Sequence, residues 1–310
     1  MRANDWHDPL WRESAHSWIG ETLSAMGTPV LGEIEETRVR PWSVTHRATT
    51  ADGVRWFKAN TMDCAYEARL VPVLAARAPD SVLTPLAVDE DRGWLLTADA
   101  GPTLRTSHGP DQRRDWREML QAYAVLQREI VPAVPDLLAV GVPDMRPSTL
   151  PAVLDSLLAG PGIPDDLAVD SAAFAQWCTE LAADGIPASL QHDDLHDDNV
   201  FPGFRFFDWG DSSVSHPFGS LLVALSSASF FMDLGRAELE ELRDAYLEVW
   251  TDLAPLPDLR RSVSLACRVG RVPKAAAWQR ALRDAALPVD EGFRTAVPEY
   301  LAELPEPTPV

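Results

Sequence analysis

The segment Gln191–Asn199 reads Gln-His-Asp-Asp-Leu-His-Asp-Asp-Asn, and it is followed by Phe207-Asp208-Trp209-Gly210-Asp211. Pro202-Gly203 lies between the two stretches and predicts a tight turn that joins two short strands. One loop and one hairpin therefore gather three polar residues: Asp194, Asn199 and Asp208. Phosphoryl transfer from a magnesium nucleotide needs such a set, because one carboxylate must deprotonate a hydroxyl while an amide and a second carboxylate hold Mg²⁺.

The composition is that of a soluble globular protein, with 310 residues of which 46% are hydrophobic and 24% charged. This length allows one large domain or two lobes. The formal net charge is −20, which argues against binding to nucleic acid, since phosphates attract a basic surface. The acidic surface serves solubility, or it attracts a cationic substrate.

Three widely spaced cysteines, Cys64, Cys178 and Cys267, indicate neither a zinc site nor a disulfide framework. The N-terminal segment lacks the apolar core of a signal peptide, and no apolar run is long enough to span a bilayer. We therefore expect a cytoplasmic protein with reduced thiols and no membrane partner. The sequence carries no sign of the oligomeric state.

The N-terminal part is expected to be rich in strands, and Asp52-Gly53 predicts a hairpin between two of them. A helix expected at 63–76 contains Pro72, which would kink or split it. The first thirty residues are expected to add another helix. The expected strands are 34–40, 47–50, 54–59, 82–88 and 93–97.

The sequence becomes mainly helical after the connector 98–103, where Gly and Pro end the last strand and predict a hinge. Apolar residues then recur at helical spacing. We predict an α+β protein whose smaller N-terminal lobe is residues 1–100 and whose larger, mainly helical C-terminal lobe is residues 101–310. The expected helices of this lobe are 111–131, 171–183, 220–232, 237–253, 259–269 and 273–286.

The pattern His-x-Asp-x-x-x-x-Asn (His192, Asp194, Asn199), followed by Asp208-Trp209-Gly210, resembles the protein-kinase-like fold. Within that fold it is similar to the aminoglycoside phosphotransferase and choline kinase family, over most of the chain in layout. The resemblance implies a bilobal α+β fold, in which a small antiparallel-sheet N-terminal lobe binds the nucleotide. The mainly helical C-terminal lobe would carry the catalytic loop and the acceptor site. The implied cofactors are ATP, or GTP, and Mg²⁺.

The resemblance also implies a role for each residue of the motif. Asp194 would be the catalytic base that accepts the proton of the acceptor hydroxyl. Asn199 and Asp208 would be the Mg²⁺ ligands, and an amide oxygen suits a hard cation because it adds no charge. His192 would be structural and hold the loop.

Lys58 lies in an otherwise apolar strand, where a buried ammonium group needs a partner. The resemblance implies that Lys58 reaches the α- and β-phosphates of the nucleotide and that Glu67, in the next helix, orients it. No glycine-rich loop precedes Lys58. A turn is expected in its place at 41–47, where Ser43 and Thr45 would contact the nucleotide phosphates.

Four carboxylates crowd the catalytic loop: Asp193, Asp194, Asp197 and Asp198. Like charges at this density raise one another's pKa unless a cation neutralises them, which favours a metal ion, a cationic acceptor or both. Asp193 stands where the family usually has Gly. Ser220 stands where an acid is common, which would loosen the support of the loop.

We therefore predict an ATP-dependent phosphotransferase that acts on a hydroxyl of a small, amine-bearing molecule, such as an aminoglycoside, an amino sugar or an amino alcohol. One alternative is a nucleotide-binding pseudokinase or regulatory module, which the missing glycines and Asp193 favour. Another is a metal-dependent hydrolase using His192, Asp194 and His196, which leaves Lys58 without a role.

Overall fold

The computed structural model describes residues 6–109, 111–283 and 289–310. The chain divides into two compact units, of which unit 1 is Met1–Gly101 with Arg280–Arg294 and unit 2 is Pro102–Gln279 with Thr295–Val310. The sequence analysis placed residues 280–294 in the C-terminal lobe, whereas here they group with unit 1. Two contacts explain this grouping: an ion pair of 3.1 Å between Arg283 and Asp63, and an edge-to-face contact between Phe293 and Trp42.

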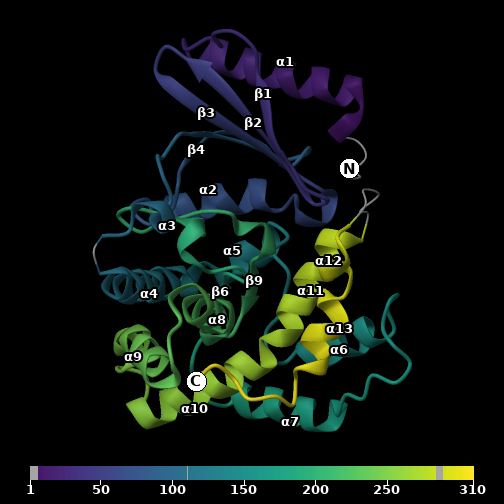
Figure 1. The fold of residues 1–310 in the computed structure, drawn as a ribbon, viewed down its shortest axis with the longest axis vertical. Coiled ribbons are helices and arrows are strands. Elements are labelled where there is room, and N and C mark those ends of the chain that lie inside the picture. Colours follow the sequence, from purple (N-terminus) through teal and green to yellow (C-terminus); the bar gives the residue numbers. More distant parts are fainter. Residues whose placement is uncertain (1–5, 110, 284–288) are drawn as a thin grey trace. The chain divides into compact units, whose positions relative to one another are not determined.

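Unit 1 is built on a five-stranded antiparallel sheet with the strand order β1-β2-β3-β5-β4 (Figure 1). The expected hairpin is present, since Thr50 pairs with Gly53 and the φ of 106° at Gly53 suits a residue without a Cβ. The strands are β1 (Glu35–Val39), β2 (Ser43–Thr50), β3 (Gly53–Asn60), β4 (Pro85–Asp89) and β5 (Trp94–Ala98).

Helix α1 (Pro9–Ala25) covers one face of this sheet (Figure 1). Asp8 caps the helix by accepting from the Leu10 amide, and Pro9 occupies the first turn. The buried residues of α1 recur every four positions, so they form one stripe along the helix: Trp11, Ala15, Ile19 and Leu23. This stripe packs against Val44 and Phe57 of the sheet. The helix expected within the first thirty residues is therefore present.

Helix α2 (Glu67–Arg77) runs through Pro72 without interruption. Pro72 was expected to kink or split this helix, and it does not split it. The proline lies in the second turn, where it removes one backbone hydrogen bond, and buried residues on both sides still pack: Leu70, Val71 and Leu74. The short helix α12 (Glu291–Arg294) also belongs to unit 1.

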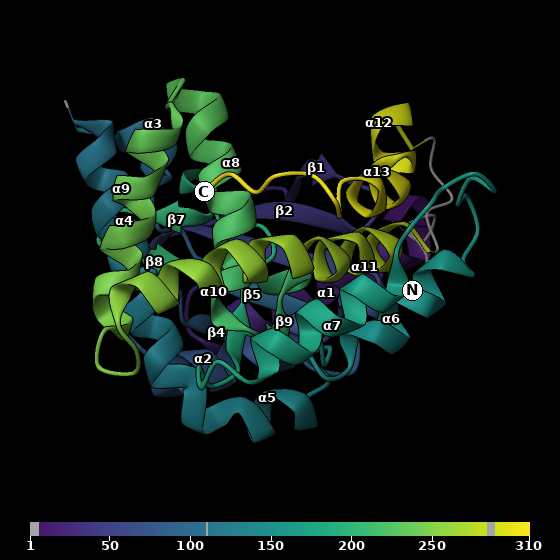
Figure 2. The same ribbon diagram turned by 90° about the horizontal axis from the view of Figure 1, so that it is seen from below.

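Unit 2 is mainly helical. Helices α4 (Gln112–Ile130) and α9 (Arg236–Leu247) lie side by side (Figures 1 and 2). Arg113 of α4 pairs with Glu238 of α9, and Arg117 of α4 pairs with Glu248, the first residue after α9. Helices α6 and α7 are also neighbours (Figure 2). The helices are α3 (Leu104–Ser107), α4 (Gln112–Ile130), α5 (Val134–Ala139), α6 (Leu150–Leu158), α7 (Ser171–Ala182), α8 (Leu221–Met232), α9 (Arg236–Leu247), α10 (Leu256–Val269), α11 (Arg271–Leu282) and α13 (Ala296–Ala302).

Two small antiparallel strand pairs interrupt the helices of unit 2. Strand β6 (Ser189–Gln191) pairs with β9 (Ser213–Ser215), and β7 (Val200–Phe201) forms a hairpin with β8 (Arg205–Phe206). The hairpin is the one that Pro202-Gly203 predicts. Together, the small antiparallel sheet and the helical remainder give the α+β class that the sequence predicts.

Several boundaries differ from expectation. Helices α5 and α6 were not among the expected helices. Pro135 and Pro151 lie in their first turns, where proline is well tolerated. The helix expected at 237–253 ends at Leu247 and is followed by a single 3₁₀ turn. Of the helix expected at 273–286, residues 284–286 lie outside the described residues. None of the described helices combines the length and hydropathy needed to cross a membrane.

Candidate active site

In unit 1 the site is organised by Lys58 on β3. Side chains alternate along a strand, so Phe57 and Ala59 point into the core under α1 and Lys58 points to the opposite face. There Lys58 Nζ lies 2.6 Å from Oε2 of Glu67 in the first turn of α2. The Glu67 side chain is only 3% exposed, so the expected ion pair is present and largely withdrawn from water.

Asn60 is a second partner of Glu67 that the sequence analysis missed. Its Nδ2 donates to Glu67 Oε2 over 2.5 Å and to the Cys64 carbonyl over 3.3 Å. Because Asn60 lies two residues after Lys58, both side chains leave β3 on the same face. The two-residue spacing of Lys58 and Asn60 was the signal in the sequence that could have identified Asn60. As a result of it, two donors of one strand hold the Glu67 carboxylate.

Ser43 and Thr45 lie on strand β2 rather than in a turn. The turn in front of β2 is short, with the Arg40 amide donating to the Ser43 carbonyl, so the expected turn at 41–47 is wrong. The strand forms because Val44 and His46 alternate into the core. Thr45 stands opposite Lys58, and Ser43 opposite Asn60, so all four side chains share one face of the sheet.

In unit 2, His192 fixes the loop that carries Asp194. Its Nδ1 accepts from the Asp194 amide over 3.2 Å, so Nε2 carries the proton that is donated to the Phe207 carbonyl over 3.0 Å. His192 is fully buried, and burial lowers its pKa. Both ring nitrogens are therefore used within the protein, which leaves neither for the metal site of a hydrolase. Among the described residues, no group of three or more His, Cys, Asp or Glu side chains is placed to hold a metal ion.

Asn199 is held beside Asp194. Its Nδ2 donates to the Asp194 carbonyl over 2.9 Å and to Asp194 Oδ2 over 3.1 Å. This geometry uses the nitrogen end of the amide and leaves the oxygen end for a cation. The Asn199 carbonyl accepts from the Phe207 amide over 3.1 Å. This bond holds Phe207, the residue before Asp208, next to Asn199.

Asp208 has a left-handed backbone conformation, with φ 63° and ψ 60°. A non-glycine residue in this region is strained, although Asp tolerates it better than most residues. The conformation turns the chain sharply between β8 and the 3₁₀ turn Trp209–Asp211. Strain at an acidic residue beside a catalytic-type loop is the kind of feature from which a functional role is inferred.

Asp194 is partly exposed, with 37% of its side chain accessible. Lys274 Nζ lies 3.4 Å from Oδ1, and His196 Nε2 lies 3.3 Å from Oδ2. Burial raises the pKa of Asp194, but the charge of Lys274 and the imidazole of His196 outweigh this effect, so the pKa lies well below its usual range. Asp194 is therefore ionised at neutral pH, as a proton acceptor must be.

The other carboxylates of the loop have partners within unit 2. Asp193 is buried and accepts from the side-chain amide of Gln191 and from the Ser213 hydroxyl. Asp197 is also buried and is bound by Arg105 at 2.8 Å and by His108 Nε2 at 2.8 Å.

Asp198 accepts from the Thr103 hydroxyl over 2.7 Å and lies 3.6 Å from Arg105. Arg105 of helix α3 thus forms ion pairs with two of the carboxylates. The charge crowding expected from the sequence is compensated by cations and donors of the protein itself, so it no longer favours a cationic acceptor.

The expectation that Ser220 loosens the support of the loop finds no counterpart in the contacts of this residue. The His192 amide donates to the Tyr123 hydroxyl over 2.9 Å and to Ser220 Oγ over 3.2 Å. Gln127 donates to Ser220 Oγ, and Tyr246 donates to Gln127 Oε1 over 2.5 Å. A buried hydrogen-bond network from α4 and α9 therefore anchors the loop in place of an acid.

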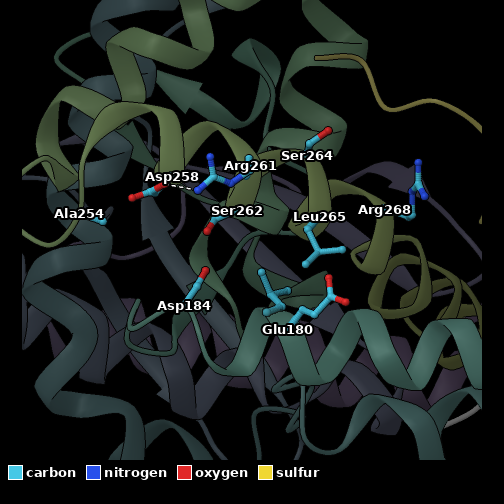
Figure 3. Close-up of a pocket in the computed structure, with 10 residues that line it drawn as sticks. Glu180, Asp184, Ala254, Asp258, Arg261, Ser262, Ser264, Leu265 and Arg268 are labelled. Carbon is cyan, nitrogen blue, oxygen red and sulfur yellow. Dashed lines mark hydrogen bonds and ion pairs between the residues drawn. The ribbon is translucent and has the colours of Figure 1, made fainter.

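A cavity of about 580 Å³ lies elsewhere in unit 2, between α7 with the residues after it and α10 (Figure 3). Asp184, Asp258 and Arg261 contribute charged groups to its wall, and Arg261 pairs with Asp258 (Figure 3). None of the predicted site residues lines it. This cavity is therefore separate from the loop that carries Asp194.

Comparison with known proteins identifies a family and several solved structures of similar fold. The sequence profile of the family described as "Phosphotransferase enzyme family" matches residues 35–256. No curated protein sequence is significantly similar to the chain.

Among solved structures, the chain is similar to a macrolide 2'-phosphotransferase type I, with a TM-score of 0.60, 17% identity and coverage of 92% of this chain and 96% of that one. A choline/ethanolamine kinase family protein from Mesorhizobium loti gives a TM-score of 0.59, 18% identity and 93% coverage of both chains. A mutant of aminoglycoside 2'-phosphotransferase-IIIa, solved as its GDP complex, gives 0.59, 15% identity and coverage of 94% and 96%. At these identities the similarity establishes a common fold, which is protein-kinase-like.

Proposed function

Because the chain belongs to the phosphotransferase enzyme family, we propose that it transfers the γ-phosphate of ATP to a hydroxyl group of a small molecule. The family and the kinase fold make it a small-molecule phosphotransferase with a hydroxyl acceptor. The nucleotide, the metal ion, the acceptor and the roles of individual residues are the content of the proposal.

Asp194 carries the proposal. Its carboxylate is ionised and partly exposed, and its backbone is held by the side chains of His192 and Asn199. As the acceptor oxygen forms its bond to the γ-phosphorus, the hydroxyl proton passes to Asp194. The bond from the γ-phosphorus to the bridging oxygen breaks at the same time, and ADP leaves.

Asn199 and Asp208 are the proposed Mg²⁺ ligands. The donor set fits, because an amide oxygen and a carboxylate are the hard oxygen ligands that Mg²⁺ prefers. The nitrogen of Asn199 is already engaged with Asp194, which leaves its oxygen for the cation. When bound, Mg²⁺ would neutralise negative charge on the phosphate oxygens.

We assign nucleotide binding to unit 1 and the catalytic loop with the acceptor site to unit 2. Lys58, oriented by Glu67, would contact the α- and β-phosphates, and Ser43 and Thr45 on the same sheet face would add hydroxyl donors. GTP is a second candidate nucleotide, supported by the neighbour that was solved as a GDP complex.

An amine-bearing acceptor, such as an aminoglycoside, an amino sugar or an amino alcohol, remains part of the proposal on the strength of the net charge of −20. A cytoplasmic location is also proposed, supported by buried thiols. Burial raises the pKa of both Cys178 and Cys267 to about 12, which keeps them protonated and unreactive.

The test is Mg²⁺-dependent release of ADP or GDP across a panel of aminoglycosides, amino sugars, amino alcohols and neutral sugars. Asp194→Asn is expected to lower kcat by about 10³-fold with nucleotide binding retained. Asp166→Asn, at an exposed loop position of the same unit, is the matched control and should leave turnover unchanged. Nucleotide binding without turnover of any acceptor would favour the pseudokinase alternative, and absence of nucleotide binding would refute the proposal.

A further inference from the structure

Lysine is used at only two positions in this chain. Of its 27 basic residues, 25 are arginine, and the lysines are Lys58 and Lys274. Each lies within 4 Å of a carboxylate that the proposed function uses: Lys58 beside Glu67, and Lys274 beside Asp194. A compact ammonium fits narrow sites that a planar guanidinium does not, so the two lysines mark positions where a point charge is needed. The proposed function gives a role to Lys58 and none to Lys274.

Lys274 lies in the first turn of α11 and is buried, with 5% of its side chain exposed. Its Nζ lies 3.4 Å from Asp194 Oδ1 and 3.3 Å from Asp211 Oδ2. It also lies 5.4 Å from the ring centroid of Trp278, one helical turn further along the same face of α11. All four residues belong to unit 2, so this cluster is a property of one compact unit.

The charge of Lys274 is secure. Burial lowers its pKa, but the carboxylates of Asp194 and Asp211 outweigh this effect, and the pKa lies above its usual value. Two carboxylates and one ammonium group have a formal net charge of minus one, the same as that of the Asp194 carboxylate alone. The protein thus supplies its own cation at Asp194, where a cationic acceptor would otherwise have had two carboxylates to bind.

The exposed fractions show which groups an acceptor can meet. The side chains of Asp194 and Asp211 are 37% and 29% exposed, while Lys274 lies behind them. A hydroxyl bound to Asp194 places the substituent on its neighbouring carbon only a few ångströms further from Nζ. At such distances the positive charge of Lys274 weakens the attraction that the two carboxylates exert on an amine, and it attracts a negative or dipolar oxygen.

We propose that Lys274 determines acceptor specificity: it disfavours acceptors with an amine on the carbon next to the reacting hydroxyl and favours those with a hydroxyl, carbonyl or carboxylate oxygen there. The inference rests on the proposed function and narrows it. An amine elsewhere on the acceptor, away from Asp194, is compatible with it.

The experiment compares acceptors that differ only beside a hydroxyl: ethanolamine against ethylene glycol and glycolate, and glucosamine against glucose. We expect the wild-type protein to give a kcat/KM about tenfold or more higher for the oxygen-bearing member of a pair. In Lys274→Met this ratio should move toward the amine by about tenfold, mainly through KM. Arg114→Met, an exposed cation of α4 paired with Glu118, is the matched control and should keep the wild-type ratio.

Lys274→Met leaves Asp194 and Asp211 without their shared cation, and the variant can fail to fold for that reason. The double variant Lys274→Met/Asp211→Asn restores the formal charge of the cluster and should show the same shift toward amines. A purely structural role of Lys274 would lower the activity with both members of a pair equally and leave the ratio unchanged.

A second readout does not need turnover. Protein labelled with ¹³Cε-lysine has two side-chain signals, which Lys58→Arg and Lys274→Arg assign. With Mg-ADP present, glycolate or glucose should shift the Lys274 signal, and ethanolamine or glucosamine should not. A wild-type preference for the amine, an equal ratio in wild type and variants, or a Lys274 signal that no acceptor shifts overturns the inference. Failure to bind any Mg-nucleotide instead overturns the proposed function.

Discussion

Lys58 Nζ lies 2.6 Å from Glu67 Oε2, and this oxygen also accepts a hydrogen bond from Asn60. Because the Glu67 carboxylate is held by two donors of one strand, it has little freedom to release Lys58. The ammonium group is therefore positioned before any ligand arrives, which reduces the cost of ordering it on binding.

The first prediction concerns this pair. Lys58→Met should lower kcat/KM for the nucleotide by about 100-fold, because a cation fixed near the phosphates is lost. Glu67→Gln should have a smaller effect, since Asn60 and Lys58 still hold the side chain. Nucleotide titrations and steady-state kinetics check both values. Arg12→Met is the control, because Arg12 is an exposed cation of α1, which covers the opposite face of the sheet. An equal loss there would argue against a specific role of Lys58.

The second prediction concerns the left-handed backbone at Asp208. Asp208→Gly should raise the free energy of unfolding by about 1 kcal/mol, because glycine adopts φ 63° without strain. The same variant should lose Mg²⁺-dependent turnover. Urea unfolding and ADP release measure the two effects, and Asp208→Asn should lose turnover with little change in stability. A destabilised Asp208→Gly would mean that contacts of the carboxylate outweigh the strain.

The third prediction is a pH dependence that originates in unit 1. His46 is fully buried among aromatic rings, its Nδ1 lies 3.1 Å from His16 Nε2, and burial lowers its pKa from 6.5 to about 4. Between these values the unfolded chain binds more protons than the folded one, so stability is complete above pH 6.5 and falls as the pH falls. From pH 7.5 to pH 5 the loss should be about 2 kcal/mol.

His46→Phe keeps a ring against Phe57 and removes the titrating group, so the pH dependence of its unfolding free energy should be shallower by that amount. Urea unfolding at several pH values tests this, with the exposed His7→Gln as control. Parallel curves for wild type and His46→Phe would exclude His46 as the source.

The fourth prediction concerns Gly219. A Cβ at this position would lie 2.1 Å from Gln191 Oε1, and Gln191 is a buried residue that donates to Asp193. Gly219→Ala should therefore destabilise the protein by about 2 kcal/mol. In a Gln191→Ala background, where the clashing side chain is absent, Gly219→Ala should be nearly neutral. A double-mutant cycle would measure this difference as a coupling free energy between the two positions.

Gly20→Ala is the matched control for Gly219. Gly20 lies within α1 with no heavy atom near an added Cβ. Its replacement should stabilise the helix by about 0.5–1 kcal/mol. A similar stability change at both glycines would refute the steric explanation.

Local sequence signals predicted much of this structure. Asp52-Gly53 marked a hairpin and Pro202-Gly203 another, because each needs only neighbouring residues to form. The lysine in an apolar strand indicated that Lys58 needs a partner, and the family resemblance identified Glu67 as that partner. The expected turn at 41–47 failed because the inward alternation of Val44 and His46 extends the strand.

Contacts between residues that are far apart in the sequence could not be predicted from local sequence patterns. Nothing around Lys274 in the sequence indicates that it lies beside Asp194, which is 80 residues away. Arg105 and Asp197 are likewise 92 residues apart. The crowded acidic loop was therefore interpreted without its partners, and only the scarcity of lysine could have drawn attention to Lys274. The roles proposed for the site residues remain predictions that the variants above test.

One of the hydrogen bonds to the loop carboxylates, from Thr103 to Asp198, also fixes one end of the connector between the two units. On the unit 1 side, the Asp99 amide donates to the Val54 carbonyl and its side chain accepts from Trp56 Nε1 over 2.8 Å. On the unit 2 side, Thr103 is bound to Asp198 over 2.7 Å. Only 100–102 lie between these anchors, and proline fixes one of their backbone angles. The connector therefore has few free backbone angles, and the residue that follows it is hydrogen-bonded to the same loop that carries Asp194.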